Sequence, residues 1–243
     1  MQPELKPIRT NDKSLGRGAN FDAAQGVAIA PEARKVLRNT YMLLALTMVP
    51  TVAGAFLGMA TGGILVDHPI ASTLIMLAGV IGLQFAITAN RNNSLGVVFL
   101  LLMTGILGWW IGPMLNFALA LKNGMQLVGY AALGTGAIFF AMGVVAMTTK
   151  RDFGFMGKFL FVGMLALLAA MIANMFLQIP ALALTISTLV IVVFSLFLLY
   201  DLNRIVRGGE TNYIMATTGV YLSLFNIFVH LLHLLMALAG QRD

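Results

Sequence analysis

The sequence predicts an all-α integral membrane protein in which seven transmembrane helices form a bundle. Hydrophobic residues make up 59% of the chain and charged residues only 10%, whereas about 25% of the residues of a typical globular protein are charged. Apolar runs of roughly 20 residues recur, and each is long enough to cross the hydrocarbon core of a bilayer. The runs do not alternate in polarity as barrel strands do. Because backbone groups in lipid must pair within their own segment, the runs are expected to be helices.

The expected spans follow one another with short connections. In chain order they cover residues 36–59, 70–89, 95–121, 125–147, 155–177, 181–206 and 213–239. The connections hold turn-forming or charged residues, such as Gly62-Gly63 after the first span and Lys122-Asn123-Gly124 after the third. We therefore expect one transmembrane domain over residues 36–243.

Residues 1–35 differ in composition from the rest of the chain. They are polar, rich in glycine and proline, and carry scattered charges, so they cannot bury enough apolar surface to offset the cost of ordering. We expect a mobile tail here, with Pro31 and Glu32 opening the first helix. No apolar core follows Met1, so we expect no cleaved signal peptide.

The distribution of positive charge predicts the orientation of the bundle. When the N-terminus is placed in the cytoplasm, only Lys122 and Arg242 of the 15 lysine and arginine residues fall on the opposite side. The positive-inside rule therefore predicts a cytoplasmic N-terminus and, with seven spans, a C-terminus on the other face. The net charge of +6 then reflects topology rather than a nucleic-acid partner.

Several classes of function have no support in the sequence. There is no cysteine, which excludes disulfides, thiol catalysis and cysteine metal sites. The chain has no H-E-x-x-H, G-x-S-x-G or Walker motif. A paired-aspartate membrane protease needs two acids within its spans, and the spans contain only Asp201. We therefore expect neither an enzyme nor a cofactor or metal site, and we interpret the 16 methionines as packing residues.

Small residues recur at four-residue spacing in two of the spans. They form the patterns Gly54-x-x-x-Gly58-x-x-x-Gly62 and Gly108-x-x-x-Gly112. Such spacing lets two helix backbones approach closely. Packing inside one bundle is the favoured interpretation, and an interface between copies of the chain is the alternative.

Asp201 is the residue whose surroundings decide most about function, because an acid inside a membrane span is costly unless it is paired, protonated or near the interface. The simplest expectation is an ion pair, either with Arg204 three residues later or with Arg91 across the bundle. The alternative is a titrating gate, since burial raises the pKa of a carboxyl group whereas a nearby arginine lowers it.

Other polar residues lie within the expected spans. His230 and His233 could sense pH, but bonding to a neighbouring backbone carbonyl, or reaching the interface, is the favoured interpretation. Two histidines without a third ligand make a weak case for zinc. Asn116, Asn174 and Asn226 are expected to hydrogen-bond between helices.

With Asp201 and the turn after it identified, the chain resembles the transmembrane Bax inhibitor motif family over about residues 34–240. The motifs that carry this resemblance are Thr149-Lys150-Arg151-Asp152-Phe153, Leu199-Tyr200-Asp201 and Tyr221-Leu222-Ser223-Leu224-Phe225-Asn226. Within the family the chain is most similar to the bacterial YccA-like branch. This narrower similarity rests on residues 35–41 (KVLRNTY), 176–182 (FLQIPAL) and 208–214 (GGETNYI).

The resemblance implies a last helix surrounded by the other six, and a latch at Asp201. In the channel-like members, two aspartates on the last two helices form a pH-sensitive latch over a calcium leak path, with an arginine nearby. Asp201 matches the first aspartate and Arg91 approximately matches the arginine, but Ser223 stands at the second position. Serine supplies no like-charge repulsion, and calcium prefers several carboxylate ligands. The calcium mechanism is therefore weakened in this chain.

The YccA-like branch is associated with FtsH, the membrane-anchored ATP-dependent protease of the bacterial inner membrane. The resemblance therefore implies an inner-membrane protein that binds and modulates FtsH, with a cytoplasmic N-terminus and a periplasmic C-terminus. Residues 1–35 would serve as an extended handle for a protease that pulls its substrates. A pH-sensitive calcium or cation leak channel is the alternative, with protons or calcium as its ligands.

Overall fold

The fold is made entirely of helices over the part of the chain that the structure describes. The computed structural model describes residues 29–240. Its elements are α1 (Pro31–Thr61), α2 (Gly63–Asp67), α3 (Pro69–Ala89), α4 (Ser94–Ala120), α5 (Gly124–Thr148), α6 (Met156–Leu177), α7 (Pro180–Val206) and α8 (Tyr213–Gly240). All but the short α2 are long and apolar enough to cross a membrane, seven in total within the described residues. The predicted seven-span membrane protein is confirmed.

The helix boundaries agree with the turn-forming residues of the sequence. Helix α1 begins at Pro31 with Glu32 in its first turn, as expected, so residues 31–35 are helical rather than part of the tail. Of the remainder of the predicted tail, residues 1–28 lie outside the described residues. Helix α2 was not predicted. Its five residues fill the connection between Gly62 and Pro69.

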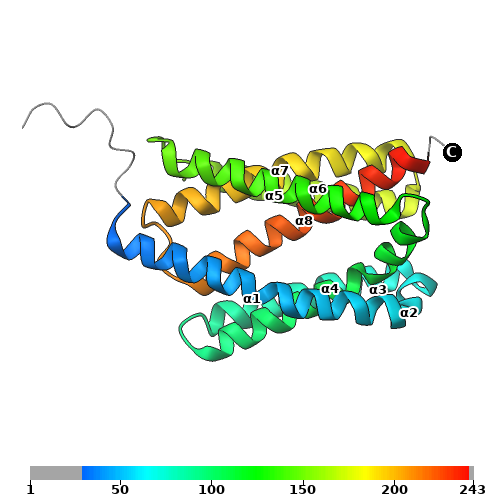
Figure 1. The fold of residues 1–243 in the computed structure, drawn as a ribbon, viewed down its shortest axis with the longest axis horizontal. Helices are drawn as coiled ribbons and strands as arrows, with labels where there is room; N and C mark the ends of the chain where they lie inside the picture. The colour runs from blue at the N-terminus through cyan, green and yellow to red at the C-terminus, as the bar shows by residue number, and fades with distance from the viewer. Residues whose placement is uncertain (1–28, 241–243) are drawn as a thin grey trace, which may run out of the picture.

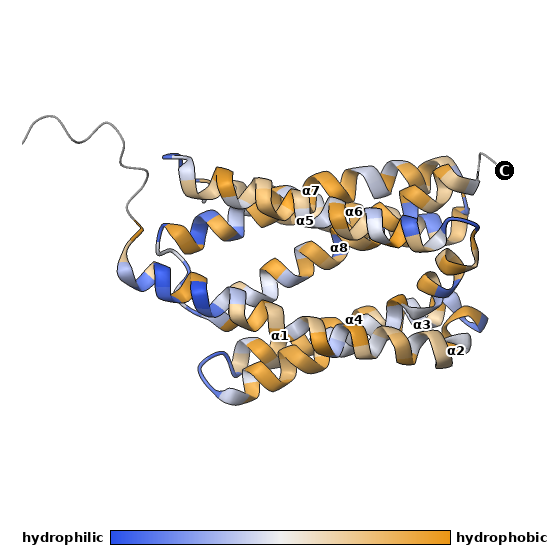
Figure 2. Ribbon diagram, viewed as in Figure 1, coloured by the Kyte–Doolittle hydropathy of each residue, from blue (hydrophilic) through white to orange (hydrophobic). Residues whose placement is uncertain are grey.

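The helices form two groups with α8 between them. Figure 1 shows α1, α3 and α4 on one side, α5, α6 and α7 on the other, and α8 crossing diagonally from one end of the bundle to the other. Helix α8 packs on α1, α3, α4, α5 and α7, whereas α6 packs mainly on α7. Hydrophilic residues gather at the helix ends (Figure 2), as expected for helices whose middle parts lie in lipid.

Helix α1 packs most extensively on α4, and glycines make the close approach of the two backbones possible. A Cβ atom on Gly54 or Gly58 would overlap backbone atoms of Gly105 or Trp109 on α4, and one on Gly108 would overlap the Thr51 carbonyl on α1. Only glycine permits this backbone approach. The prediction that the two glycine patterns pack inside one bundle is confirmed.

The central part of α8 is tied to this pair by Tyr221. The Tyr221 side chain is fully buried. Its hydroxyl lies 2.8 Å from Thr51 Oγ1 on α1 and donates to the Thr104 carbonyl on α4 at 3.4 Å. A buried hydroxyl needs a hydrogen-bond partner, and these bonds satisfy it while fixing the position of α8 against α1 and α4.

Candidate functional site

The turn between α7 and α8 closes one end of the bundle. Gly208 has a φ of +74°, a left-handed conformation that glycine adopts without strain. This reversal lets the Gly209 and Glu210 amides donate to the Arg204 carbonyl at 2.9 and 3.2 Å. The Arg204 side chain in turn donates to the Gly209 carbonyl at 3.2 Å and pairs with Glu210, with 3.2 Å between Nη2 and Oε2. The turn is therefore folded back onto the end of α7.

Asn212 directly precedes α8, caps its first turn, and also joins the helix to another part of the chain. Its Oδ1 atom accepts hydrogen bonds from the amides of Ile214 and Met215 at 3.0 and 3.1 Å, which satisfies amides that a helix start leaves free. Its Nδ2 atom donates to the Arg91 carbonyl at 2.7 Å and to Asn92 Oδ1 at 3.1 Å. One side chain thus caps α8 and links it to the α3–α4 connection.

Asn203 links α7 to the α5–α6 connection in a similar way. Its side chain is almost completely buried. It accepts a hydrogen bond from the Phe153 amide at 3.2 Å and donates to the Arg151 carbonyl at 3.3 Å. The α5–α6 connection is therefore held against α7, and amide side chains tie both this connection and the α3–α4 connection to the last two helices.

Asp201 lies half-buried one turn before this network. Its carboxylate faces α8 at Gly219, where a Cβ atom would come within 2.7 Å of Oδ2. The predicted ion pair with Arg204 or Arg91 is wrong. Arg204 pairs with Glu210, whose carboxylate is brought within reach by the turn at Gly208, and Arg91 is exposed. No lysine or arginine within residues 29–240 forms an ion pair with Asp201.

Ser223 is buried on the same side of α8 as Gly219, because residues four apart in a helix share a face. It lies about 6 Å further along the helix axis than Gly219. Within the described residues no three histidine, aspartate or glutamate side chains are grouped to hold a metal ion, so the geometry adds no support to a calcium latch. The latch role of Asp201, Ser223, Arg91 and Arg204 stays a prediction.

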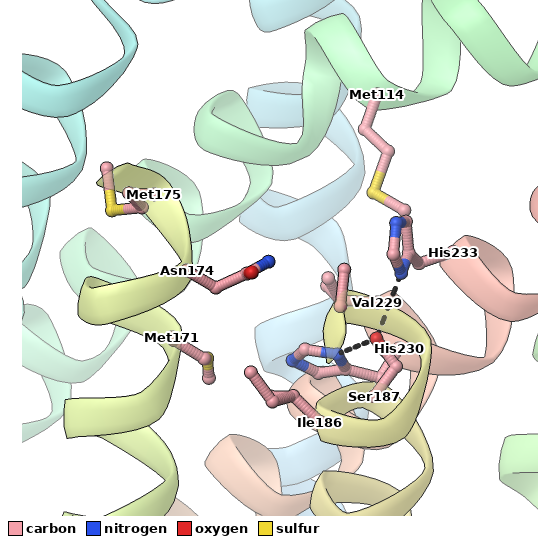
Figure 3. Close-up of a pocket in the computed structure, with 10 residues that line it drawn as sticks. Met114, Met171, Asn174, Met175, Ile186, Ser187, Val229, His230 and His233 are labelled. Atoms are coloured by element: carbon pink, nitrogen blue, oxygen red, sulfur yellow. Dashed lines mark hydrogen bonds between the residues drawn. The ribbon is translucent and has the colours of Figure 1, made fainter. Parts of the chain in front are cut away.

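A second polar cluster lies in the other half of α8. Ser187 of α7 is buried, and its hydroxyl lies 2.9 Å from His233 Nδ1 and 3.0 Å from His230 Nδ1. Figure 3 shows both imidazole rings directed at this one oxygen. The expectation that the histidines bond backbone carbonyls or reach the interface is wrong for these ring nitrogens, because Ser187 occupies both.

The asparagines of the spans behave differently from one another. Asn116 donates to the Met59 carbonyl at 2.6 Å and so links α4 to α1, as predicted. Asn174 instead accepts from the Ile179 amide at 3.2 Å in the turn after its own helix. Asn226 donates to the Leu222 carbonyl of its own helix at 2.8 Å. The predicted bonds between helices are therefore not made by these two side chains.

Four residues of these clusters were missed by the sequence reasoning, and one of them, Asn203, is a polar residue near the end of an apolar run whose partners lie in another connection. Asn212 carried a signal, because asparagine directly before an apolar run is typical of a helix start. Glu210 and Ser187 carried none, since their partners are determined by the turn at Gly208 and by the packing of α7 on α8.

Comparison with known proteins agrees with the motifs. The family described as inhibitor of apoptosis-promoting Bax1 matches residues 33–241. An uncharacterized membrane protein of Vibrio cholerae is 40% identical over 204 residues, which cover 84% of this chain and 90% of that protein. The modulator of FtsH protease YccA of Escherichia coli is 40% identical over 201 residues, covering 83% and 89%. An uncharacterized protein of Pseudomonas aeruginosa is 36% identical over 223 residues, covering 92% and 98%. The chain is therefore a multi-pass membrane protein that belongs to the Bax inhibitor family.

Proposed function

We propose that this chain is an inner-membrane protein that binds the membrane-anchored protease FtsH and modulates its activity. The observation that carries the proposal is the similarity to the Escherichia coli protein named modulator of FtsH protease YccA. The similarity extends over 89% of that protein, so it concerns the whole bundle rather than one segment. A second Escherichia coli relative of the same identity is named inner membrane protein YccA, which supports the location.

The packing of the bundle suits a protein that occupies such a protease without being degraded quickly. An ATP-dependent protease extracts a membrane substrate by pulling, so its rate depends on how firmly the helices hold together. Backbone contact between α1 and α4 and the side-chain bonds of Asn203 and Asn212 resist the separation of helices. The polar composition of residues 1–25 suits a segment that the protease engages from the cytoplasm.

Co-purification tests the proposal. The full-length chain is expressed with an FtsH variant that binds ATP but does not hydrolyse it, and the chain is isolated from detergent-solubilised membranes. We expect FtsH to be recovered with the chain. Deleting residues 1–25 should reduce the recovery and lengthen the lifetime of the chain in cells. A scrambled version of the same 25 residues is the matched control and should retain both properties.

Two results would contradict the proposal. One is the absence of FtsH from the isolated material, and the other is a lifetime that does not change when FtsH is depleted. The channel alternative has its own measurement, calcium flux into liposomes containing the purified chain. We expect little flux at any pH, and Ser223→Asp, which restores a second carboxylate, should raise it or make it sensitive to pH. Flux in the unaltered chain that Asp201→Asn abolishes would favour the channel.

A further inference from the structure

A groove runs between α1 and α5, with α8 as its floor. The two helices stand on opposite sides of α8 (Figure 1), and each packs on α8 far more than on the other. Two hollows with volumes of about 400 and 590 Å³ lie between them, and the walls of both include Met48 of α1 and Leu224 of α8. The hollows are therefore parts of one groove. Neither Asp201 nor the Ser187 cluster lines it.

The wall of the groove is apolar. No charged side chain of the described residues lines either hollow. The few hydroxyl groups of the deeper hollow bond to the protein itself. Thr51 Oγ1 and the Tyr221 hydroxyl lie 2.8 Å apart, and Thr135 Oγ1 donates to the Ala131 carbonyl at 2.8 Å. A ligand of this groove therefore gains from apolar contact rather than from hydrogen bonds.

The shape of the groove suits one extended acyl chain. Its rims are exposed, with Met48 and Val52 on α1 and Phe140 and Val144 on α5, so it opens toward the surrounding lipid. It follows residues 41–55 of α1, about 21 Å along a helix, whereas one leaflet contributes about 15 Å of hydrocarbon. A helix of that length, about 10 Å across, would occupy about 1,600 Å³, which is more than the two hollows hold together. The groove therefore accommodates a lipid chain but not another helix.

Basic residues gather at one end of the groove. Helix α1 has 31 residues and is about 46 Å long, so its first turns extend beyond a hydrocarbon core of about 30 Å. Arg34 and Arg38 lie in these turns, on the face that continues through Tyr41 into the groove, because residues three or four apart share a face. On the other side, Lys150 follows the groove residue Met147 by three positions. All three cations are exposed, and none forms an ion pair within residues 29–240.

We propose that the groove binds one anionic phospholipid. One acyl chain lies between α1 and α5, and Arg34, Arg38 and Lys150 bind the phosphate of the headgroup. Arginine suits this role because its guanidinium group can donate two parallel hydrogen bonds to phosphate oxygens. Tyr41 lies between the basic and the apolar parts, as expected of a tyrosine at the membrane surface. Glu32, the acid of the first turn of α1, lies on the opposite face of the helix at 100° per residue. The proposal does not depend on the proposed action on FtsH.

Lipid titration tests both halves of the proposal. The full-length chain in detergent is titrated with phosphatidylglycerol or with phosphatidylcholine of the same acyl chains, and bound lipid is counted by native mass spectrometry. We expect one tightly bound lipid per chain and at least fivefold tighter binding of phosphatidylglycerol. Ala132→Trp fills the groove and should weaken the binding of both lipids at least fivefold. Arg34→Gln with Arg38→Gln should abolish the preference for phosphatidylglycerol and leave the binding of phosphatidylcholine unchanged.

Matched controls lie outside the groove. Ala137→Trp alters an exposed alanine of α5 that lines neither hollow. Arg91→Gln with Lys158→Gln removes two exposed charges at helix ends on the same side of the membrane as the start of α1, since the seven spans alternate in direction. Both controls should bind as the unaltered chain does, and thermal unfolding checks that each variant is folded. The proposal is overturned if the two lipids bind equally, or if the controls weaken binding as much as the groove variants do.

A measurement on the unaltered chain does not depend on the folding of any variant. The chain is placed in liposomes that contain phosphatidylglycerol with a photoreactive diazirine in one acyl chain, and the labelled residues are identified by mass spectrometry. Labelling should be concentrated in the groove, at residues such as Val52 and Leu224. Phe85 of α3 and Phe161 of α6 are exposed but lie outside the groove and should be labelled less. Equal labelling of all four residues would mean that only the surrounding bilayer is in contact with the chain, and would overturn the proposal.

Discussion

The two ends of α8 use polar side chains in different ways. At its start, Asn212 bonds two amides of its own helix and two groups of the α3–α4 connection, and Arg204 and Glu210 hold the preceding turn. In its second half, His230 and His233 bond a single hydroxyl and direct their remaining ring nitrogens away from it. The first end uses its polar atoms to fix the backbone, whereas the second uses them to join side chains of α7 and α8.

The largest expected effect comes from forcing apart α1 and α4, the helix pair on which both ends of α8 depend. Gly108→Leu places a side chain where the Thr51 backbone lies, so α1 and α4 must move apart. Forcing atoms into a packed interface costs about 1–3 kcal/mol and occasionally more, and the overlap here is with backbone atoms, which cannot move aside as a side chain can. Thermal unfolding in detergent should show a strongly lowered midpoint. Gly129→Leu is the control, since a Cβ atom there meets nothing within 4 Å. Equal midpoints for the two variants would contradict the close approach.

The next largest effect on stability is expected in the second half of α8, where His230 and His233 lie. Ser187→Ala removes a buried hydroxyl that bonds the Nδ1 atoms of two half-buried histidines, and leaving polar groups of a protein interior without partners costs about 1–3 kcal/mol. Ser195→Ala is the matched control on the same helix, because its hydroxyl bonds only the Ile191 carbonyl one turn earlier. We expect a clear loss of stability for the first variant and a much smaller one for the second. Similar losses would show that the Ser187 hydroxyl has no special role.

At the start of α8, Asn212→Ala should lower the free energy of unfolding by about 0.5–2 kcal/mol, the usual cost of removing a helix cap. Asn212→Asp separates the two roles of the residue, because it keeps an oxygen for the α8 amides and removes the donor to Arg91 and Asn92. Its loss should be smaller. Asn123→Ala is the control, since Asn123 stands before α5 without a side-chain cap bond. A greater loss for Asn123→Ala than for Asn212→Ala would contradict the cap.

The sequence was informative where one segment decides its own structure. Apolar runs bounded by glycine, proline and asparagine predicted all seven long helices, because the need to span lipid and the turn chemistry are both local. That the glycine patterns pack inside the bundle was also predictable, since four-residue glycine spacing lets helix backbones approach closely, but the pairing of α1 with α4 was not predicted. The five residues of α2 are too few for a periodic pattern.

The partners of polar side chains were less predictable. Spacing along α7 suggested that Asp201 pairs with Arg204, but it could not reveal that a left-handed glycine at position 208 brings Glu210 to the same arginine. Likewise, nothing near His230 and His233 in the sequence points to Ser187, which lies far away along the chain and meets them only because α7 packs on α8.

The smallest expected effect on stability is that of Glu210→Gln in the turn before α8. The substituted side chain would keep one oxygen to accept from the Asn212 amide, which donates to Glu210 Oε1 at 3.0 Å, and would lose the charged oxygen that faces Arg204. The Arg204 side chain is 45% exposed, so the pair is screened by solvent and worth about 0.2–1 kcal/mol. A double-mutant cycle with Arg204→Gln, measured at low and high salt, isolates this energy. The coupling should shrink as salt increases, because exposed charges are screened over about 10 Å at 0.1 M. A coupling that is large and independent of salt would mean that charge, rather than the hydrogen bonds of Asn212, holds this end of α8.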